Sequence, residues 1–193
     1  MIEVDFAILG GGASGLSLAL ALAQSPLGDR SILLVEKEAK NRNDRTWCYW
    51  ARENSPFYGI IPMTDHPFPR QLGNRVLSIG ARGGRVKPST GFAFSRIQRD
   101  TRAIVNSIVH HHHPFDIPPD SRRHRFYDSI MLDVMLRQND QVKQILTTMF
   151  TRNPVQRILR FLDDQTHIWG DINVLASLPP VPFLRALRNH LWK

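Results

Sequence analysis

Three glycines near the start of the 193-residue chain have the spacing of a phosphate-binding turn. Gly10, Gly12 and Gly15 match G-x-G-x-x-G, in which the glycines permit a tight turn, backbone approach to a diphosphate and close helix packing. Glu36 follows, and its carboxylate can accept hydrogen bonds from an adenosine ribose with a free 2′-hydroxyl. The spacing predicts a dinucleotide site without distinguishing FAD from NAD. The alternative is a turn that uses glycine only for its geometry.

The elements around these residues form a predicted β-α-β unit. Apolar strands are expected over residues 4–9 and 31–36, the second ending in the acid. Between them, residues 13–24 are rich in Leu and Ala and are followed by Ser25-Pro26, which predicts a helix. Because this helix begins at the glycines, its first N–H groups are available to a phosphate.

A second strand, glycine-rich loop and helix start lie in residues 70–102, a stretch with eight basic residues and one acid. Residues 75–80 are expected to form a strand, and apolar residues at helical spacing from Phe94 predict an amphipathic helix. Ser89 or Thr90 is expected to cap this helix, whose first N–H groups would then face an anion.

Aromatic side chains surround an arginine and the single cysteine in residues 43–50. Arg45 could face a phosphate or a flavin edge, and the aromatic rings could line an apolar ligand slot. Plain aromatic packing is the alternative. Cys48 is expected to be a small buried side chain, and a lone cysteine excludes a disulfide framework.

The chain is basic, with a formal net charge of +8, and the excess lies beyond residue 40. A basic surface favours an anionic partner such as a phosphate-rich cofactor, an anionic membrane surface or nucleic acid. Nucleic acid is not expected, because Phe92 and Phe94 fit helix packing and no recognised nucleic-acid module is present. The acidic start is unlike a secretory signal, and no stretch has the roughly 18 apolar residues of a membrane span. We expect a cytoplasmic protein, soluble or peripheral on the membrane.

Four consecutive histidines, His110–His113, precede a breaker-rich link over residues 114–119. Since adjacent residues cannot all face one ion, a solvated loop is expected rather than a metal site. Beyond the link, apolar patterns over residues 126–162 predict several short helices. Residues 181–193 combine an apolar face with basic residues, which fits either an anionic membrane surface or a docked core helix.

Five further segments, together with the glycine turn, resemble the bacterial lycopene cyclase family. They are DRTWCYW (44–50), GIIPMTDHPFP (59–69), IGARGGRVKPSTGFAFSRIQRD (79–100), RRHRFYDSIMLDVML (122–136) and LPPVPFLRAL (178–187). The resemblance implies a flavoprotein isomerase, or intramolecular lyase, of carotenoid biosynthesis. It would hold reduced FAD, with NAD(P)H as reductant, without net redox turnover. A carboxylic acid would protonate an end of lycopene or a related linear carotenoid, and the carbocation would close to a β-ionone ring.

The resemblance also assigns cofactor contacts. Gly10, Gly12, Gly15 and Glu36 would hold the ADP half of FAD. Six further residues would lie near the diphosphate or the flavin: Arg45, Gly83, Gly84, Ser89, Thr90 and Gly91. No metal is implied.

Members of the family are roughly twice this length, so a central part is expected to be missing near residues 55–59. The expected fold is α/β: a Rossmann-like FAD/NAD(P)-binding part with a truncated parallel sheet over residues 1–109, then a mainly α-helical part over 120–193. The family's acid motif is not found, so no catalytic residue is assigned. Asp65 is the nearest candidate for the acid, against a turn or capping role. The alternative function is a non-catalytic nucleotide-binding remnant or interaction module.

Overall fold

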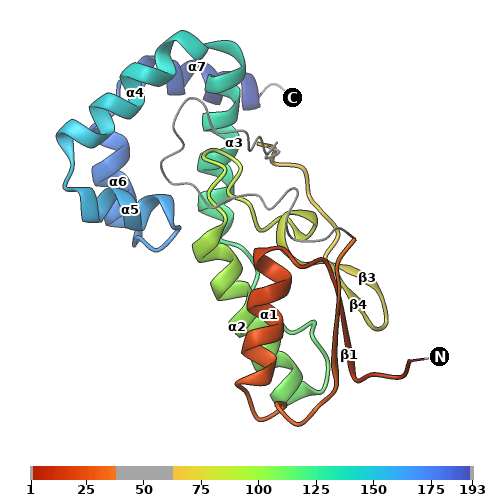
Figure 1. The fold of residues 1–193 in the computed structure, drawn as a ribbon. Coiled ribbons are helices and arrows are strands. Elements are labelled where there is room, and N and C mark those ends of the chain that lie inside the picture. The colour runs from red at the N-terminus through yellow and green to blue at the C-terminus, as the bar shows by residue number, and fades with distance from the viewer. Residues whose placement is uncertain (1, 38–62, 192–193) are drawn as a thin grey trace, which may run out of the picture. The chain divides into compact units, whose positions relative to one another are not determined.

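The computed structural model describes residues 2–37 and 63–191 and is an α/β protein (Figure 1). Its described residues divide into two compact units that are interleaved along the chain. Unit 1 comprises Met1–Pro62, Pro67–Val86 and Ala93–Pro118, and unit 2 comprises Met63–His66, Lys87–Phe92 and Pro119–Lys193. The predicted division into residues 1–109 and 120–193 stays a prediction.

Unit 1 begins with a β-α-β arrangement, as predicted from the sequence. Strand β1 (Phe6–Leu9) pairs in parallel with β2 (Ile32–Val35), with Phe6 opposite Ile32 and Leu9 opposite Val35. Helix α1 (Ala13–Ala23) connects the two strands along the chain. It ends where the Ser25 hydroxyl donates to the Leu22 carbonyl, just before Pro26. Apolar strands of this kind are stable only when a helix covers their side chains.

Helix α2 (Phe94–His111) supplies that cover and lies beside α1 (Figure 1). The predicted amphipathic pattern is confirmed, because Ile97, Ile104 and Val105 are buried. Ile104 and Val105 pack in one cluster with Ile8, Leu18 and Leu22 of β1 and α1. The helix ends inside the histidine run, where His112 adopts a left-handed backbone with φ +60°.

The strand predicted over residues 75–80 is largely wrong. Within this range only Val76–Leu77 forms a strand (β4), and it pairs antiparallel with β3 (Gln71–Gly73) in a sheet separate from β1 and β2. A two-residue turn brings β3 next to β4, and such local pairing closes a very short loop. From Gly80 the chain turns into a short 3₁₀ helix, η1 (Gly80–Gly83).

Unit 2 is helical, as predicted for the later chain. Its helices are α3 (Arg122–Arg137), α4 (Asn139–Arg152), α5 (Val155–Leu162), α6 (Ile168–Ala176) and α7 (Pro180–Leu191). One apolar cluster joins all five: Ile130, Val134, Ile145, Met149, Ile158, Leu162, Val174, Leu178 and Ala186. Pro154 precedes α5, where its missing N–H costs no helical hydrogen bond.

The last helix is docked on this core, which is one of the two alternatives drawn from its sequence. Ala186 is fully buried, and Phe183 and Leu187 pack against the cluster. Leu184 remains 62% exposed. Among the described residues, no helix combines the length and the apolar character needed to cross a bilayer.

Candidate functional site

The predicted phosphate-binding turn has the geometry that its glycines suggested. Gly10 donates its N–H to the Val35 carbonyl at 2.7 Å and has φ +108°. A Cβ built on Gly15 would lie 1.9 Å from the Gly10 carbonyl oxygen, so no other residue fits there without moving the backbone. These contacts bring the start of α1 against the ends of β1 and β2.

Gly12 differs from its neighbours because nothing among the described residues requires a glycine there. Its φ of −72° is open to any residue, and a Cβ on it would meet no atom of the described residues within 4 Å. The space beside Gly12 faces the N-terminal end of α1, which has no side-chain cap. A diphosphate needs such an open approach to a helix N-terminus, so the turn fits a dinucleotide.

Glu36 lies at the same turn. Its Oε2 accepts a hydrogen bond from the Gly11 N–H at 2.5 Å, and its Oε1 accepts one from the Lys37 N–H. The carboxylate is exposed. The acid after β2 is therefore held beside the glycines, where the sequence analysis placed the adenosine ribose.

The structure brings the second glycine-rich segment against the first within unit 1. Gly80, at the start of η1, has φ +59°, and a Cβ on it would lie 2.4 Å from the Ser14 Oγ of α1. Gly83 ends η1, and Gly84 follows in a left-handed conformation. Ser14 belongs to the first turn of α1, so Gly80 lies at the N-terminal end of that helix.

Two arginines and an aspartate, for which no site role was predicted, hold this second segment. The Gly83 carbonyl accepts hydrogen bonds from Arg70 Nη1 at 3.3 Å and Arg85 Nε at 3.1 Å. Asp100 of α2 is buried, with its Oδ1 2.7 Å from Arg70 Nη2 and 3.8 Å from Arg85 Nη1. The only feature of the sequence that could have indicated this cluster is Asp100, the one acidic residue among the eight basic residues of 70–102.

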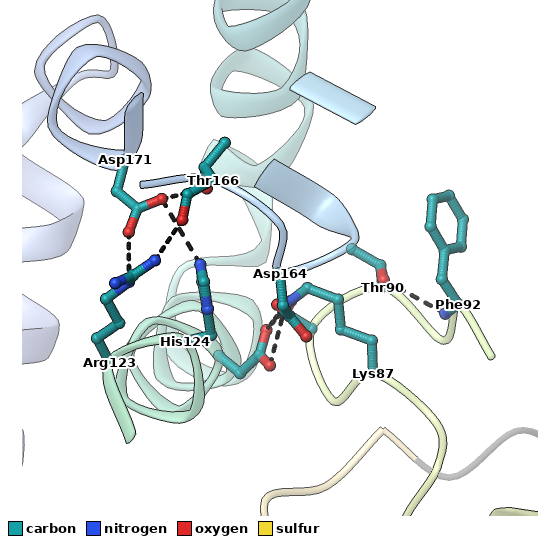
Figure 2. Close-up of polar contacts among 10 residues, drawn as sticks. Lys87, Thr90, Phe92, Arg123, His124, Asp164, Thr166 and Asp171 are labelled. Carbon is teal, nitrogen blue, oxygen red and sulfur yellow. Dashed lines mark hydrogen bonds and ion pairs between the residues drawn. The ribbon is translucent and has the colours of Figure 1, made fainter. Parts of the chain in front are cut away.

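The predicted capping of α2 by Ser89 or Thr90 is wrong. The helix begins at Phe94, its N-cap is Ala93, and no side chain caps it. The Thr90 hydroxyl instead accepts a hydrogen bond from the Phe92 N–H (Figure 2). Gly91 donates its N–H to the Lys87 carbonyl. These bonds fold Lys87–Phe92 into a compact loop of unit 2, because Lys87 also donates its N–H to the Phe92 carbonyl.

This loop is fastened to unit 2 by a buried lysine. Lys87 is 4% exposed, and its Nζ lies 2.9 Å from Asp128 Oδ1 and 2.6 Å from Asp164 Oδ1 (Figure 2). The Ser89 hydroxyl donates to Asp128 Oδ1. Ser89, predicted to contact the cofactor, thus directs its hydroxyl into the interior of unit 2.

A second set of polar side chains in unit 2 surrounds the buried Asp171. Arg123 Nε is 2.8 Å from Asp171 Oδ2, and Thr166 donates its hydroxyl to Asp171 Oδ1 (Figure 2). His124 is 2% exposed, its Nε2 lies 3.6 Å from Asp171 Oδ1, and neither ring nitrogen has a hydrogen-bond partner among the described residues. Burial is the main cause that lowers the pKa of His124, so its ring is favoured in the neutral form.

Tyr127 lies on the ring of His124 in an edge-to-face contact and stacks on Phe161. Burial, and next the charge of Asp171, raise the pKa of the Tyr127 hydroxyl. Unit 2 thus encloses charged and neutral polar groups that local sequence patterns did not reveal, since their partners lie far apart in the chain.

The remaining predicted residues have other surroundings. Asp65, the nearest candidate for an acid, is exposed and accepts a hydrogen bond from the Ser129 hydroxyl at 2.7 Å. No group of metal-ligating side chains gathers within residues 2–37 and 63–191. His111, from the histidine run, instead pairs with Asp116 at 3.0 Å. Arg45, Cys48 and the predicted junction at residues 55–59 lie outside the described residues.

Comparison with known proteins identifies the family. The family model described as lycopene cyclase protein matches residues 53–188, more than half of the chain. The match includes the Gly80–Gly84 segment and unit 2 helices, and it begins after the Gly10–Gly15 turn. Neither the curated proteins nor the solved structures give a match. The chain therefore belongs to the lycopene cyclase family, as its sequence motifs predicted.

Proposed function

We propose that this protein binds FAD at the Gly10–Gly15 turn and cyclises the ends of lycopene, or of a related linear carotenoid, to β-ionone rings. Family membership supports the carotenoid substrate. The observation that carries the cofactor proposal is the open approach beside Gly12 at the uncapped start of α1. A Rossmann-like fold for unit 1 belongs to the same proposal.

Different residues of unit 1 would bind different parts of the cofactor. Backbone N–H groups at the start of α1 would bind and orient the diphosphate, because the positive end of a helix dipole attracts anions. Glu36, whose carboxylate accepts the Gly11 N–H in this structure, would accept hydrogen bonds from the ribose hydroxyls. The predicted contacts of Arg45, Gly83, Gly84, Ser89, Thr90 and Gly91 with FAD remain predictions.

The reaction conserves the atoms of the substrate. A proton adds to the terminal double bond, the resulting carbocation attacks within the chain to close the ring, and a proton leaves the ring. Reduced FAD, with NAD(P)H as its reductant, would supply negative charge that stabilises the cation. The proton donor is assigned to none of the described residues, since Asp65 is exposed and bonded to Ser129.

Two measurements test the proposal. Purified protein titrated with FAD should show saturable binding and a rise in melting temperature, since a ligand that binds only the folded state stabilises it. Expression in a lycopene-accumulating host should convert lycopene to a cyclic product. FAD binding without conversion would favour the non-catalytic alternative, and absence of both would overturn the proposal.

An attachment to anionic membrane surfaces is a separate proposal. A carotenoid substrate resides in the bilayer, and the exposed Val181 and Leu184 of docked α7 lie near the basic residues of its sequence. Sedimentation with anionic vesicles at low salt would support attachment, and failure to sediment would reject it.

A further inference from the structure

One cluster in unit 1, made of the buried Asp100 and the partly buried Arg70 and Arg85, links helix α2 to the turn that abuts the start of α1. Asp100 projects from α2 and lies 2.7 Å from Arg70 Nη2. Arg70 also donates from Nη1 to the Gly83 carbonyl, so one guanidinium bridges the carboxylate and the turn. Arg85 joins the same two groups, through Nε to Gly83 and at 3.8 Å to Asp100.

We infer that Asp100, acting through Arg70 and Arg85, positions the Gly80–Gly84 turn to contact the dinucleotide bound at Gly10–Gly15. The inference rests on the proposed function. Asp100 is a positioning residue here, because its carboxylate touches the arginines rather than the ligand. Nothing in the family comparison assigns a role to these three side chains.

The packing of the turn shows why its position needs fixing. A Cβ on Gly83 would lie 2.4 Å from the Ser78 carbonyl oxygen and 2.5 Å from Arg70 Nη1, so the backbone and the guanidinium approach closely. At the other end of η1, Gly80 approaches the Ser14 side chain just as closely. The turn is therefore held at Gly83 and abuts α1 at Gly80.

The guanidinium is suited to this task by its shape. Arginine presents several N–H donors in a rigid fork, whereas lysine has one ammonium on a flexible stem. Arg70 uses two nitrogens for two different acceptors, which a lysine at this position could not reproduce with the same geometry. A lysine at position 70 would therefore keep the positive charge while changing the hydrogen bonds that position the turn.

Asp100→Asn tests the inference, because loss of positioning and gain of positive charge would change the affinity for FAD in opposite directions. The change keeps the size of the side chain and makes the protein more positive by one charge, so long-range attraction alone would strengthen binding of FAD. Loss of positioning would weaken it. We expect the Kd for FAD to rise about tenfold, within the roughly 5- to 150-fold range of couplings between sites.

Arg70→Lys is the second variant, and it preserves the charge. We expect a similar rise in Kd with an unchanged dependence on salt. Asp171→Asn is the matched control, because it also removes a buried carboxylate from an arginine, but in unit 2. It should leave the Kd for FAD within about twofold of wild type, since the partners of Asp171, Arg123 and Thr166, belong to unit 2 and not to the Gly80–Gly84 turn. The visible spectrum of FAD bound at saturation should change in Asp100→Asn and not in Asp171→Asn.

The outcomes separate this inference from the proposed function. Wild-type protein that binds no FAD overturns the proposed function itself. If wild type binds and folded Asp100→Asn binds equally or more tightly, only the positioning role is rejected. If Asp100→Asn does not fold, Arg70→Lys decides, and an unchanged Kd in that variant rejects the role. An equal loss in Asp171→Asn also rejects it, because the effect would then be general loosening.

Discussion

The ammonium nitrogen of Lys87 lies 2.6 Å from Oδ1 of Asp164, although 77 residues separate them in the sequence. The lysine is buried with Asp128 as its second partner, so its removal would take one ammonium group away from two carboxylates. Removing one partner of a buried ion pair costs about 3–5 kcal/mol. We expect Lys87→Met to lower the free energy of unfolding by that amount, measured by urea denaturation.

Arg137→Met provides the control for this prediction. Arg137 pairs with Asp133 one turn earlier in α3, but its side chain is largely exposed. Such surface pairs contribute about 0–1 kcal/mol. A loss for Lys87→Met as small as that for Arg137→Met would contradict the view that Lys87 fastens its loop to unit 2.

The glycines at positions 12 and 15 should respond differently to alanine. Gly12→Ala places a methyl group in open space, so the free energy of unfolding should fall by at most about 1 kcal/mol, the size of a helix-cap effect. FAD affinity should nevertheless fall, because the methyl group blocks approach of the diphosphate. Gly15→Ala should reduce both stability and affinity, because its Cβ overlaps the Gly10 carbonyl. Thermal melting and FAD titration of the two variants check this; unchanged affinity in Gly12→Ala would argue against the site.

Glu36 sets the expected preference for an unphosphorylated ribose. Glu36→Gln keeps the side-chain size and removes the charge that strengthens hydrogen bonds from the ribose. Hydrogen bonds to charged groups contribute about 1.5–3 kcal/mol, so affinity for ADP should fall about tenfold or more. Discrimination against an ADP analogue with a 2′-phosphate should fall too. Calorimetric titration with both nucleotides measures the ratio, and a ratio equal to wild type would exclude the ribose contact.

His124 should make unit 2 less stable in acid. The pKa of His124 is lowered in the folded protein, chiefly by burial, while Asp164 and Asp171 oppose the shift and Arg123 and Lys87 add to it. Below about pH 6.5, the ordinary histidine pKa, the unfolded chain binds a proton that the folded chain resists. The contribution of His124 to stability is therefore complete above pH 6.5 and is lost as pH falls through the lowered pKa.

His124→Gln should flatten this part of the pH dependence of unfolding. His167→Gln is the control for this variant, because His167, the residue before α6, is exposed. Urea denaturation between about pH 7 and pH 5 compares the three proteins, using the reference pKa as the upper limit of the window. The same slope in His124→Gln and wild type would show that other groups cause the acid sensitivity.

Local patterns predicted the elements of this fold well where each element interacts with its neighbours in sequence. The glycine turn, the helix after it and the parallel strand pair follow from residues 4–36, which form one connected unit. The apolar spacing of α2 likewise indicated its buried face. Residues 75–80 were misjudged because the short turn before Val76 pairs it with Gln71–Gly73 instead of with β1.

The polar interior was beyond sequence reasoning. Lys87 is one of eight bases in residues 70–102, and no local pattern links it to Asp128 or Asp164. Their pairing depends on tertiary packing, which no local period encodes. Ser89 was assigned to a helix cap for the same reason, whereas its hydroxyl bonds to Asp128. The Arg70–Asp100 pair is a further example, formed between the residue before β3 and helix α2.

The interleaving of the two units has a consequence for synthesis and for truncation. Lys87 leaves the ribosome well before Asp128 and Asp164, so the loop it carries must wait for the helical segment before its charge is matched. A fragment containing only residues 119–193 would keep all five helices of unit 2 but would bury two carboxylates without the ammonium group. The five helices of unit 2 are therefore consecutive in the chain, but the residues that stabilise them are not. Cutting the chain at a single point cannot separate unit 2 from unit 1 with all of its residues.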